Sequence, residues 1–139
     1  MTAKHVLRYS VCYPDTDSGG VVNHGRYIDM AERARHDLLK QAGLSYALLR
    51  TEHATLLVVH KLSVTYHAPG VLEDDLDIGT ELTLCSAART TWLTTIRRGT
   101  ALLATVQAEL AALNAGSKTV RQHPDILLGK LAVFCNRDS

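Results

Sequence analysis

Apolar residues recur at two different spacings along the chain, and the spacing changes near residue 27. Between residues 5 and 13 every second side chain shares one face, and these residues are His5, Leu7, Tyr9, Val11 and Tyr13. This alternation predicts a strand with one buried side. Further on, apolar positions recur every three or four residues, at Tyr27, Ile28, Ala31, Ala34, Leu38 and Ala42. The second pattern predicts a helix over residues 25–42 that stops at Gly43.

The rest of the chain is predicted to hold a short helix, a run of strands and a mixed tail. Ser45 is a typical helix cap, so a short helix is expected over residues 45–52. Strands are expected over residues 58–67, 75–84, 88–98 and 101–113. Their clearest apolar faces are Val58, His60, Leu62, Val64 and Tyr66, then Leu76, Ile78, Leu82 and Leu84, then Leu102, Ala104, Val106, Ala108 and Leu110. After Lys118, a last edge strand and a short helix from Asp125 to Phe134 are expected, separated by Pro124.

Strands with one apolar and one polar face pair in an antiparallel sheet that packs one side on the core. One early helix followed by such strands predicts an α+β fold, in which a single sheet wraps over one helix. The chain has 139 residues, which is enough for one domain with its own core. We therefore expect residues 1–139 to form a single domain.

Composition and charge exclude several classes of function. The formal net charge is +1, which creates no field that would recruit nucleic acid or an anionic membrane surface. No apolar run approaches the roughly 18 residues of a membrane span, and Met1 to Arg8 has no apolar signal-peptide core. Cys12, Cys85 and Cys135 are odd in number and far apart, which favours reduced thiols. A soluble cytoplasmic protein without a nucleic-acid partner is expected.

Candidate chemistry gathers where the first strand passes into the long helix. Asp15 and Asp17 follow the strand, Gly19 and Gly20 form a flexible turn, and the helix is expected to begin near His24. A carboxylate can attack the carbonyl of an acyl group to give a mixed anhydride, or it can deprotonate a water molecule. The free N–H groups at a helix start can polarise the same carbonyl. Asp17 is the candidate for this chemistry, although aspartate is also a common turn residue; Asp15 is interpreted as a support for the turn.

Two blocks of the chain resemble the 4-hydroxybenzoyl-CoA thioesterase family, and within it the bacterial acyl-CoA thioesterases associated with the Tol–Pal system. The first block matches at Tyr13, Asp15-Thr16-Asp17, Gly19-Gly20-Val21-Val22, His24, Tyr27 and Glu32-Arg33-Ala34-Arg35. The second, residues 66–76, is similar to the Tyr-x-x-Pro-Ala segment and the Asp-Asp-x-Leu strand start of the family. The chain departs from the pattern at Pro14, where an acidic residue is usual, and at Asn23, where the family has Tyr.

The resemblance implies a hotdog fold, with an antiparallel sheet of five or six strands around one long helix. It implies a thioester hydrolase acting on an acyl-CoA or acyl-carrier substrate with a short-chain or aromatic acyl group. Asp17 would be nucleophile or general base, the backbone N–H of His24 would polarise the carbonyl, and Tyr13 would lie near the thioester. The substrate would be surrounded by Gly19, Gly20, Val21, Val22, Asn23 and Gly25. The family also implies a homo-oligomer, a dimer of dimers with the active site at the dimer interface.

Other functions stay open or can be set aside on spacing. A non-catalytic hotdog module that binds acyl-CoA is the main alternative. A hotdog hydratase or dehydratase would need an Asp-x-x-x-x-His spacing, and Asp17 to His24 is two residues longer. The Asp17-Ser18-Gly19-Gly20 run copies a serine-protease nucleophile motif but lacks the upstream partners of that site. The seven histidines show no zinc-ligand spacing and no nucleotide-binding motif is present, so no metal and no cofactor are expected. Candidates for binding the CoA phosphates are Arg89, Arg97, Arg98, Lys118, Arg121 and Lys130.

Overall fold

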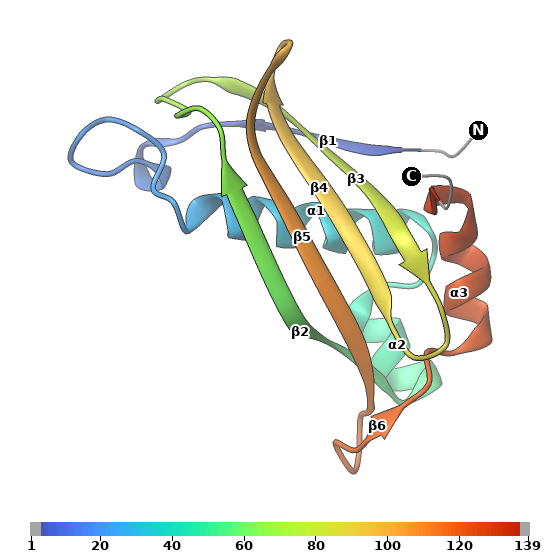
Figure 1. The fold of residues 1–139 in the computed structure, drawn as a ribbon. Coiled ribbons are helices and arrows are strands. Elements are labelled where there is room, and N and C mark those ends of the chain that lie inside the picture. Colours follow the sequence, from blue (N-terminus) through green and yellow to red (C-terminus); the bar gives the residue numbers. More distant parts are fainter. Residues whose placement is uncertain (1–3, 137–139) are drawn as a thin grey trace.

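A computed structural model describes residues 4–136 and shows a curved antiparallel sheet with one long helix across its concave face (Figure 1). The helices are α1 (Arg26–Gln41), α2 (Tyr46–His53) and α3 (Asp125–Leu131), with single 3₁₀ turns at Tyr13–Asp15 and Ala132–Phe134. The strands are β1 (His5–Ser10), β2 (Thr55–Tyr66), β3 (Asp75–Cys85), β4 (Thr90–Arg98), β5 (Ala101–Asn114) and β6 (Val120–Arg121).

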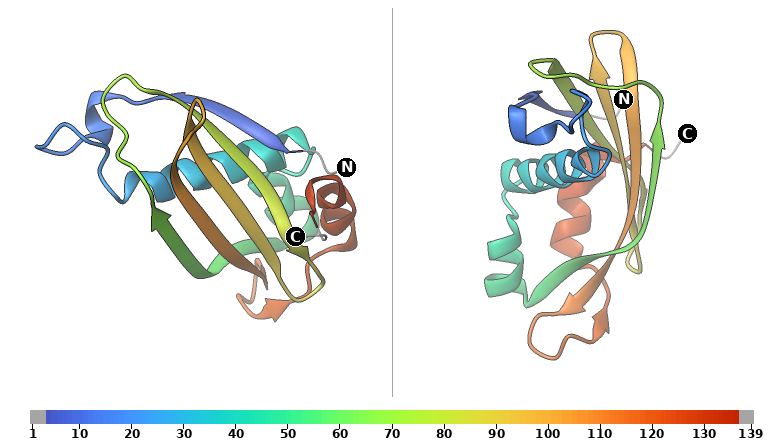
Figure 2. Two further views of the ribbon diagram at one scale, coloured as in Figure 1. Left: turned by 45° about the horizontal axis from the view of Figure 1, so that its top comes forward. Right: turned by 90° about the vertical axis from the view of Figure 1, so that its left-hand side faces the viewer.

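The strands lie in the order β1-β3-β4-β5-β2, and the short β6 adds to the end of β5. Every pairing of these strands is antiparallel. Because β1 and β2 stand at the two ends of the strand order, they are the edge strands of the sheet. The sheet curves around α1, while α2 and α3 lie beyond the end of α1 (Figure 2). The predicted α+β hotdog architecture is confirmed.

The core lies between α1 and the sheet and divides along the length of the helix. Ala31 and Ala34 are fully buried, and their small side chains let the helix backbone approach the strands closely. The first half of α1 packs on β1, β3, β4 and β5 through the buried residues Val11, Val22, Tyr27, Met30, Leu76, Ile78, Ile96, Leu103 and Val106. The second half joins α2, α3 and Trp92 in a second cluster that includes Leu38, Leu39, Leu49, Leu82, Leu110, Leu127 and Leu131.

The helix boundaries agree with the sequence signals. Helix α1 ends just before Gly43, whose positive φ of 84° is the conformation that glycine adopts most readily. Ser45 caps α2, because its hydroxyl accepts a hydrogen bond from the backbone N–H of Leu48 at 3.2 Å. The part of the chain that the structure describes contains no helix long and apolar enough to cross a membrane.

The strands differ from the predicted alternation where β-bulges occur. A bulge between Leu82 and Leu84 shifts the register of β3, so that Leu84 is exposed and Cys85 is buried instead. Another irregularity between Ile96 and Arg97 shifts β5, and Leu103 rather than Leu102 enters the core. An extra residue in one strand reverses the faces beyond it, and the sequence carries no period-two signal for where it falls.

The first strand is shorter than predicted. Strand β1 ends at Ser10, and residues 13–15 form a 3₁₀ turn in place of the end of the strand. Pro14 has no N–H group to donate to a neighbouring strand, which favours this turn. Tyr13 is therefore outside the sheet, and Val11 is the last residue of the alternation that reaches the core.

Candidate functional site

The segment between the 3₁₀ turn and α1 is held in place by Asp15. Its carboxylate is almost fully buried, and one oxygen, Oδ2, accepts from the Tyr9 hydroxyl at 2.7 Å and from the Cys12 N–H at 2.8 Å. The guanidinium of Arg26, in the first turn of α1, lies 3.9 Å from the other oxygen. Burial and the bond to Asp15 together raise the pKa of Tyr9 to about 12. Asp15 thus links β1, the turn and α1, which agrees with its interpretation as a support.

Asp17 lies at the tip of a small hairpin and is exposed. Its N–H donates to the Val21 carbonyl at 2.9 Å, and its carbonyl accepts from Gly20 N–H at 3.1 Å. Gly20 has a φ of 80°, which explains a glycine at that position. One carboxylate oxygen, Oδ1, accepts from the Gly19 N–H at 2.8 Å. Among the described residues no hydrogen bond reaches Oδ2, so this oxygen is open to solvent or to a substrate.

Tyr13 lies close to the hairpin, and its side chain does not pack on the core. Its side chain is 79% exposed, in contrast to the strand position expected for it. Together with Thr16, Asp17, Ser18, Gly20 and Leu72 it lines a shallow depression of 410 Å³. The structure therefore places Tyr13 and Asp17 on one surface feature.

His24 lies in the turn before α1, two residues ahead of the first helical residue. The N–H groups around it are bonded: Val22 to Gly70, Asn23 to Asp15, and Arg26 to Asn23, with distances of 2.8 to 2.9 Å. Gly25 N–H donates to the side-chain oxygen of Asn23 at 3.0 Å. Within residues 4–136, no acceptor lies in hydrogen-bonding range of the His24 N–H. This donor is available at the positive end of α1.

A second, more apolar depression of 280 Å³ lies beside His24. It is lined by Val22, His24, Tyr27, Tyr66, His67, Ala68 and Pro69. Val21 and Val71 form an isolated bridge, and the residues next to them in sequence, Val22 and Leu72, line this depression and the one at Asp17, respectively. In a single chain, Asp17 and His24 thus open onto neighbouring depressions rather than a common cavity.

Residues 66–70 were not predicted as contacts of the site, yet they hold it. The Tyr66 hydroxyl donates to the His24 carbonyl at 2.9 Å, and Gly70 N–H donates to the Tyr27 hydroxyl at 3.0 Å. A Cβ atom at Gly70 would lie 3.0 Å from Val22, so glycine permits this close approach. The only sequence signal for these contacts is the second block of the family resemblance, since the partners are about 42 residues apart.

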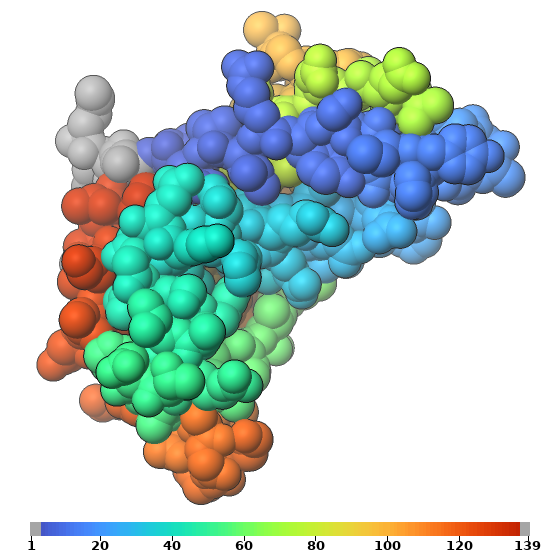
Figure 3. Space-filling view, turned by 180° about the vertical axis from the view of Figure 1, so that it is seen from behind, coloured from blue at the N-terminus to red at the C-terminus, as the bar shows by residue number. Residues whose placement is uncertain are grey.

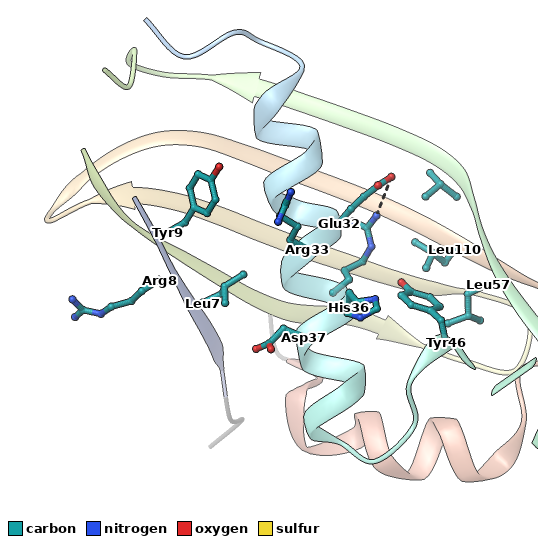
Figure 4. A pocket seen from close by; sticks show the side chains of 12 residues that line it. Leu7, Arg8, Tyr9, Glu32, Arg33, His36, Asp37, Tyr46, Leu57 and Leu110 are labelled. Carbon is teal, nitrogen blue, oxygen red and sulfur yellow. Dashed lines mark ion pairs between the residues drawn. The ribbon is translucent and has the colours of Figure 1, made fainter. Parts of the chain in front are cut away.

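A cavity of 690 Å³ lies elsewhere and is lined by residues of β1, α1, α2, β2 and β5 (Figure 4). Figure 3 shows the face of the molecule on which α1 and α2 lie. Arg35 is only 3% exposed there, and its guanidinium lies 3.9 Å from the Glu32 carboxylate. Burial raises the pKa of Tyr46 on the same wall. None of the candidate catalytic residues lines this cavity, so its size alone does not mark the reaction site.

Several of the basic residues considered for CoA phosphates are already engaged. Arg98 pairs with Asp74 at 2.7 Å, and Arg89 pairs with Glu109 at 2.7 Å. Partial burial alone would raise the pKa of Asp74, but the Val71 N–H and the Arg98 guanidinium lower it overall. Arg121 donates to the His53 carbonyl. Among the described residues no three His, Cys, Asp or Glu side chains form a group that could hold a metal ion.

A hotdog sheet and helix, with a carboxylate and an available N–H ahead of the helix, define the class of protein. The profile of the thioesterase superfamily matches residues 19–105, and the chain belongs to this family. It is 45% identical to the acyl-CoA thioester hydrolase YbgC of Escherichia coli O157:H7 over 73 residues, 52% of this chain and 54% of the relative. The chain thus matches about half the length of that relative. The acyl-CoA thioesterase YbgC of Haemophilus influenzae is 32% identical over 106 residues, 76% of this chain and 78% of the relative.

Solved structures agree with the family. A probable thioesterase from Bartonella henselae superimposes with a TM-score of 0.82 at 30% identity, covering 88% of this chain and all (100%) of the other. The 1,4-dihydroxy-2-naphthoyl-CoA thioesterase of Synechocystis has a TM-score of 0.85 at 22% identity, covering 94% of this chain and 96% of the other. At that identity the second similarity shows the fold alone.

Proposed function

We propose that this protein hydrolyses the thioester bond of a short-chain or aromatic acyl-CoA, or of the corresponding acyl-carrier thioester. The observation that carries the proposal is the presence, within eight residues of sequence, of two polar groups that have no hydrogen-bond partner in the described chain: one oxygen of the Asp17 carboxylate and the backbone N–H of His24. The YbgC relatives, which are named acyl-CoA thioesterases, support the same activity.

Asp17 would supply the reactive carboxylate. As a nucleophile it would attack the thioester carbon, expel the CoA thiolate and leave a mixed anhydride that water then hydrolyses. As a general base it would take a proton from a water molecule that attacks the same carbon. Its exposure in one chain leaves Oδ2 free for either step. Tyr13, on the same depression, would contact the substrate near the thioester.

His24 would stabilise the negative charge that develops on the carbonyl oxygen in both routes. Its N–H is fixed in direction because the carbonyl of the same planar peptide group, that of Asn23, accepts from the Arg26 N–H at 2.9 Å. Such a preorganised donor stabilises the transition state more than the bound substrate, because negative charge has then moved onto the carbonyl oxygen. The imidazole of His24 would orient Asp17 or contact the substrate.

The acyl group would enter the 280 Å³ depression beside His24. Ligand pockets usually measure roughly 300–1,000 Å³, so this depression is just below that range. Its aromatic walls, Tyr27 and Tyr66, and its aliphatic residues Val22 and Ala68 suit a small apolar acyl group. In this arrangement Gly19, Gly20, Val21, Asn23 and Gly25 shape the backbone around the thioester.

The site would be completed by a second copy of the chain. In one chain the Asp17 carboxylate faces solvent, whereas charge stabilisation in catalysis works best where water is excluded. Strand β2 is a 12-residue sheet edge with exposed Val58, Val59 and Leu62, and such an edge favours pairing with another strand. We propose a dimer, and a dimer of dimers, in the cytoplasm; light scattering that gave the mass of one 15.2 kDa chain would contradict it.

A panel of thioesters tests the activity. Purified protein is mixed with acetyl-, butyryl-, octanoyl-, benzoyl- and 4-hydroxybenzoyl-CoA, and released CoA is followed with a thiol reagent. We expect hydrolysis well above the enzyme-free rate for at least one butyryl or aromatic substrate. If no thioester is cleaved while calorimetry detects acyl-CoA binding, the protein is the non-catalytic binding module instead.

A further inference from the structure

The loop of residues 70–74, which directly precedes β3, is bonded to the chain just before the turn that leads to Asp17 (Figure 1). Val11 N–H donates to the Asp74 carbonyl, and the Val11 carbonyl accepts from Glu73 N–H, both at 2.9 Å. Val11 follows the last residue of β1 and is buried in the core. The loop therefore holds the point at which the chain leaves the sheet toward Asp17.

The same loop is bonded to the chain just after Asp17. Val22 N–H donates to the Gly70 carbonyl at 2.8 Å, and Val21 forms an isolated antiparallel bridge with Val71. The Val21 carbonyl in turn accepts from the Asp17 N–H at 2.9 Å. One loop thus contacts both ends of the segment whose exposed tip carries the candidate catalytic carboxylate.

The side chain of Asp74 joins this loop to the sheet. Its Oδ2 accepts from Val71 N–H at 2.9 Å and from the guanidinium of Arg98, the last residue of β4, at 2.7 Å. Arg98 also donates to the Pro69 carbonyl at 3.4 Å. The Asp74 side chain is 15% exposed, and a partly buried ion pair is screened less by salt than a fully exposed one. Arg98 therefore ties the loop to β4 at two points.

The backbone of the loop depends on such contacts. Glu73 has a φ of 69°, in the left-handed region that a glutamate rarely adopts. A residue stays in this region where the surrounding contacts hold it there. Without the Arg98–Asp74 ion pair, the turn is expected to relax. Val71 would then no longer be held against Val21.

We propose that Asp74 and Arg98 are positioning residues for the Asp17 carboxylate; this rests on the function proposed above. Within the described chain, neither side chain lines the depression at Asp17, but Leu72 of the same loop does. Their effect reaches the reaction through the loop, and a displacement of a catalytic group by about 1 Å can cost up to a hundredfold in rate. A direct contact of Arg98 with the CoA phosphates would act differently, because it would affect only substrates that carry the nucleotide.

Kinetics with two thioesters separate these roles. The acyl group that is cleaved best is supplied on CoA and on pantetheine, which lacks the nucleotide and its phosphates. Arg98→Ala and Asp74→Asn are each expected to lower kcat about tenfold or more with both thioesters. Glu109→Gln is the matched control, because Glu109 pairs with Arg89 at the same 2.7 Å, is 13% exposed and lines neither depression at the site. Its kcat should equal wild type.

Two kinetic results would overturn the positioning role. A loss in Arg98→Ala that is confined to the CoA thioester would make this residue a phosphate ligand instead. A kcat equal to wild type in both Arg98→Ala and Asp74→Asn would show that the ion pair does not act on the reaction.

A second measurement does not depend on activity. Amide hydrogen exchange, followed by NMR of ¹⁵N-labelled protein, should be about fivefold or more faster at Val11, Val22 and Glu73 in Asp74→Asn, because these N–H groups bond to or within the clamped region. Glu109→Gln should leave these three amides unchanged. If the wild-type chain cleaves no thioester, the proposed function fails, and the exchange result alone decides whether the ion pair holds this segment. Unchanged exchange at the three amides, or an equal acceleration throughout the sheet, would overturn the proposal.

Discussion

Asp15 and Asp17 are two residues apart, and they differ in their surroundings: the carboxylate of Asp15 is buried and accepts two hydrogen bonds at one oxygen, whereas that of Asp17 is exposed. Replacing Asp15 by Ala removes the oxygen that accepts from Tyr9 and Cys12. Hydrogen bonds to a charged group contribute about 1.5–3 kcal/mol each, so two of them set an upper limit of about 3–6 kcal/mol. Tyr9 and Cys12 are not fully buried, and water can partly replace the lost acceptor. The expected loss in the free energy of unfolding is therefore about 2–4 kcal/mol.

Two further variants bracket this value. In Asp15→Asn the side-chain oxygen can still accept both bonds, because both go to Oδ2, so we expect a smaller loss of about 1 kcal/mol. Asp17→Ala removes only the local bond from Gly19 at an exposed position, and its effect should stay below about 1 kcal/mol. Tyr9 provides a second readout: its pKa, raised to about 12 by burial and by Asp15, should fall in Asp15→Ala but stay above 10, because the burial remains.

Urea unfolding followed by circular dichroism measures the three losses, and ultraviolet titration at high pH follows the tyrosine. For a chain of this length, about 3 kcal/mol corresponds to a fall in Tm of roughly 10 °C. If Asp17→Ala destabilises as much as Asp15→Ala, Asp17 is itself a structural turn residue. If Asp15→Ala loses less than about 1 kcal/mol, the bonds to Tyr9 and Cys12 do not hold the segment as described.

Two more predictions concern His24 and the pH dependence of stability. His24→Ala should lose less activity than Asp17→Asn, whereas His24→Pro removes the N–H donor and should lower kcat a hundredfold or more, about 3 kcal/mol, if circular dichroism and oligomer size are unchanged. A folded but fully inactive His24→Ala would instead place the imidazole in the chemistry. Burial holds the pKa of His123 below its usual 6.5. The unfolded chain therefore binds the proton first, and the free energy of unfolding should decline as the pH falls below about 6.5. His123→Gln, measured by urea unfolding from pH 7.5 to 5, should weaken this decline; an equal slope would refute it.

The helices could be predicted from sequence because their signals are local. The three- and four-residue spacing from Tyr27 to Ala42 predicted a helix over 25–42, and α1 spans Arg26–Gln41. Ser45 predicted the start of α2, because a serine cap bonds to a backbone N–H only three residues later, here that of Leu48. The fold class could be predicted from the order of the helix and the strands. Strands that alternate apolar and polar residues pack one face on a core, and only a few arrangements of helix and sheet layers bury that face.

What the sequence did not predict depends on contacts between distant segments. The bulges near Leu84 and Leu103 arise from how one strand pairs with the next, and no local pattern marks them. The bond from Tyr66 to His24 joins residues 42 positions apart, and Tyr66 could only be interpreted as a sheet residue beforehand. The role of Asp15 was predicted, but its partner Tyr9 was not, because that bond depends on the 3₁₀ turn that replaces the end of β1.

The turnover of Asp17→Asn tests the central claim most directly. The substitution keeps the size of the side chain and the oxygen that accepts from Gly19, but it removes the charge needed by either a nucleophile or a general base. Glu52→Gln, the same chemical change at an exposed position on α2, is the matched control. With the best acyl-CoA of the panel, we predict that Asp17→Asn loses at least about a hundredfold in kcat while Glu52→Gln equals wild type. A folded Asp17→Asn protein that keeps most of its activity would contradict the account.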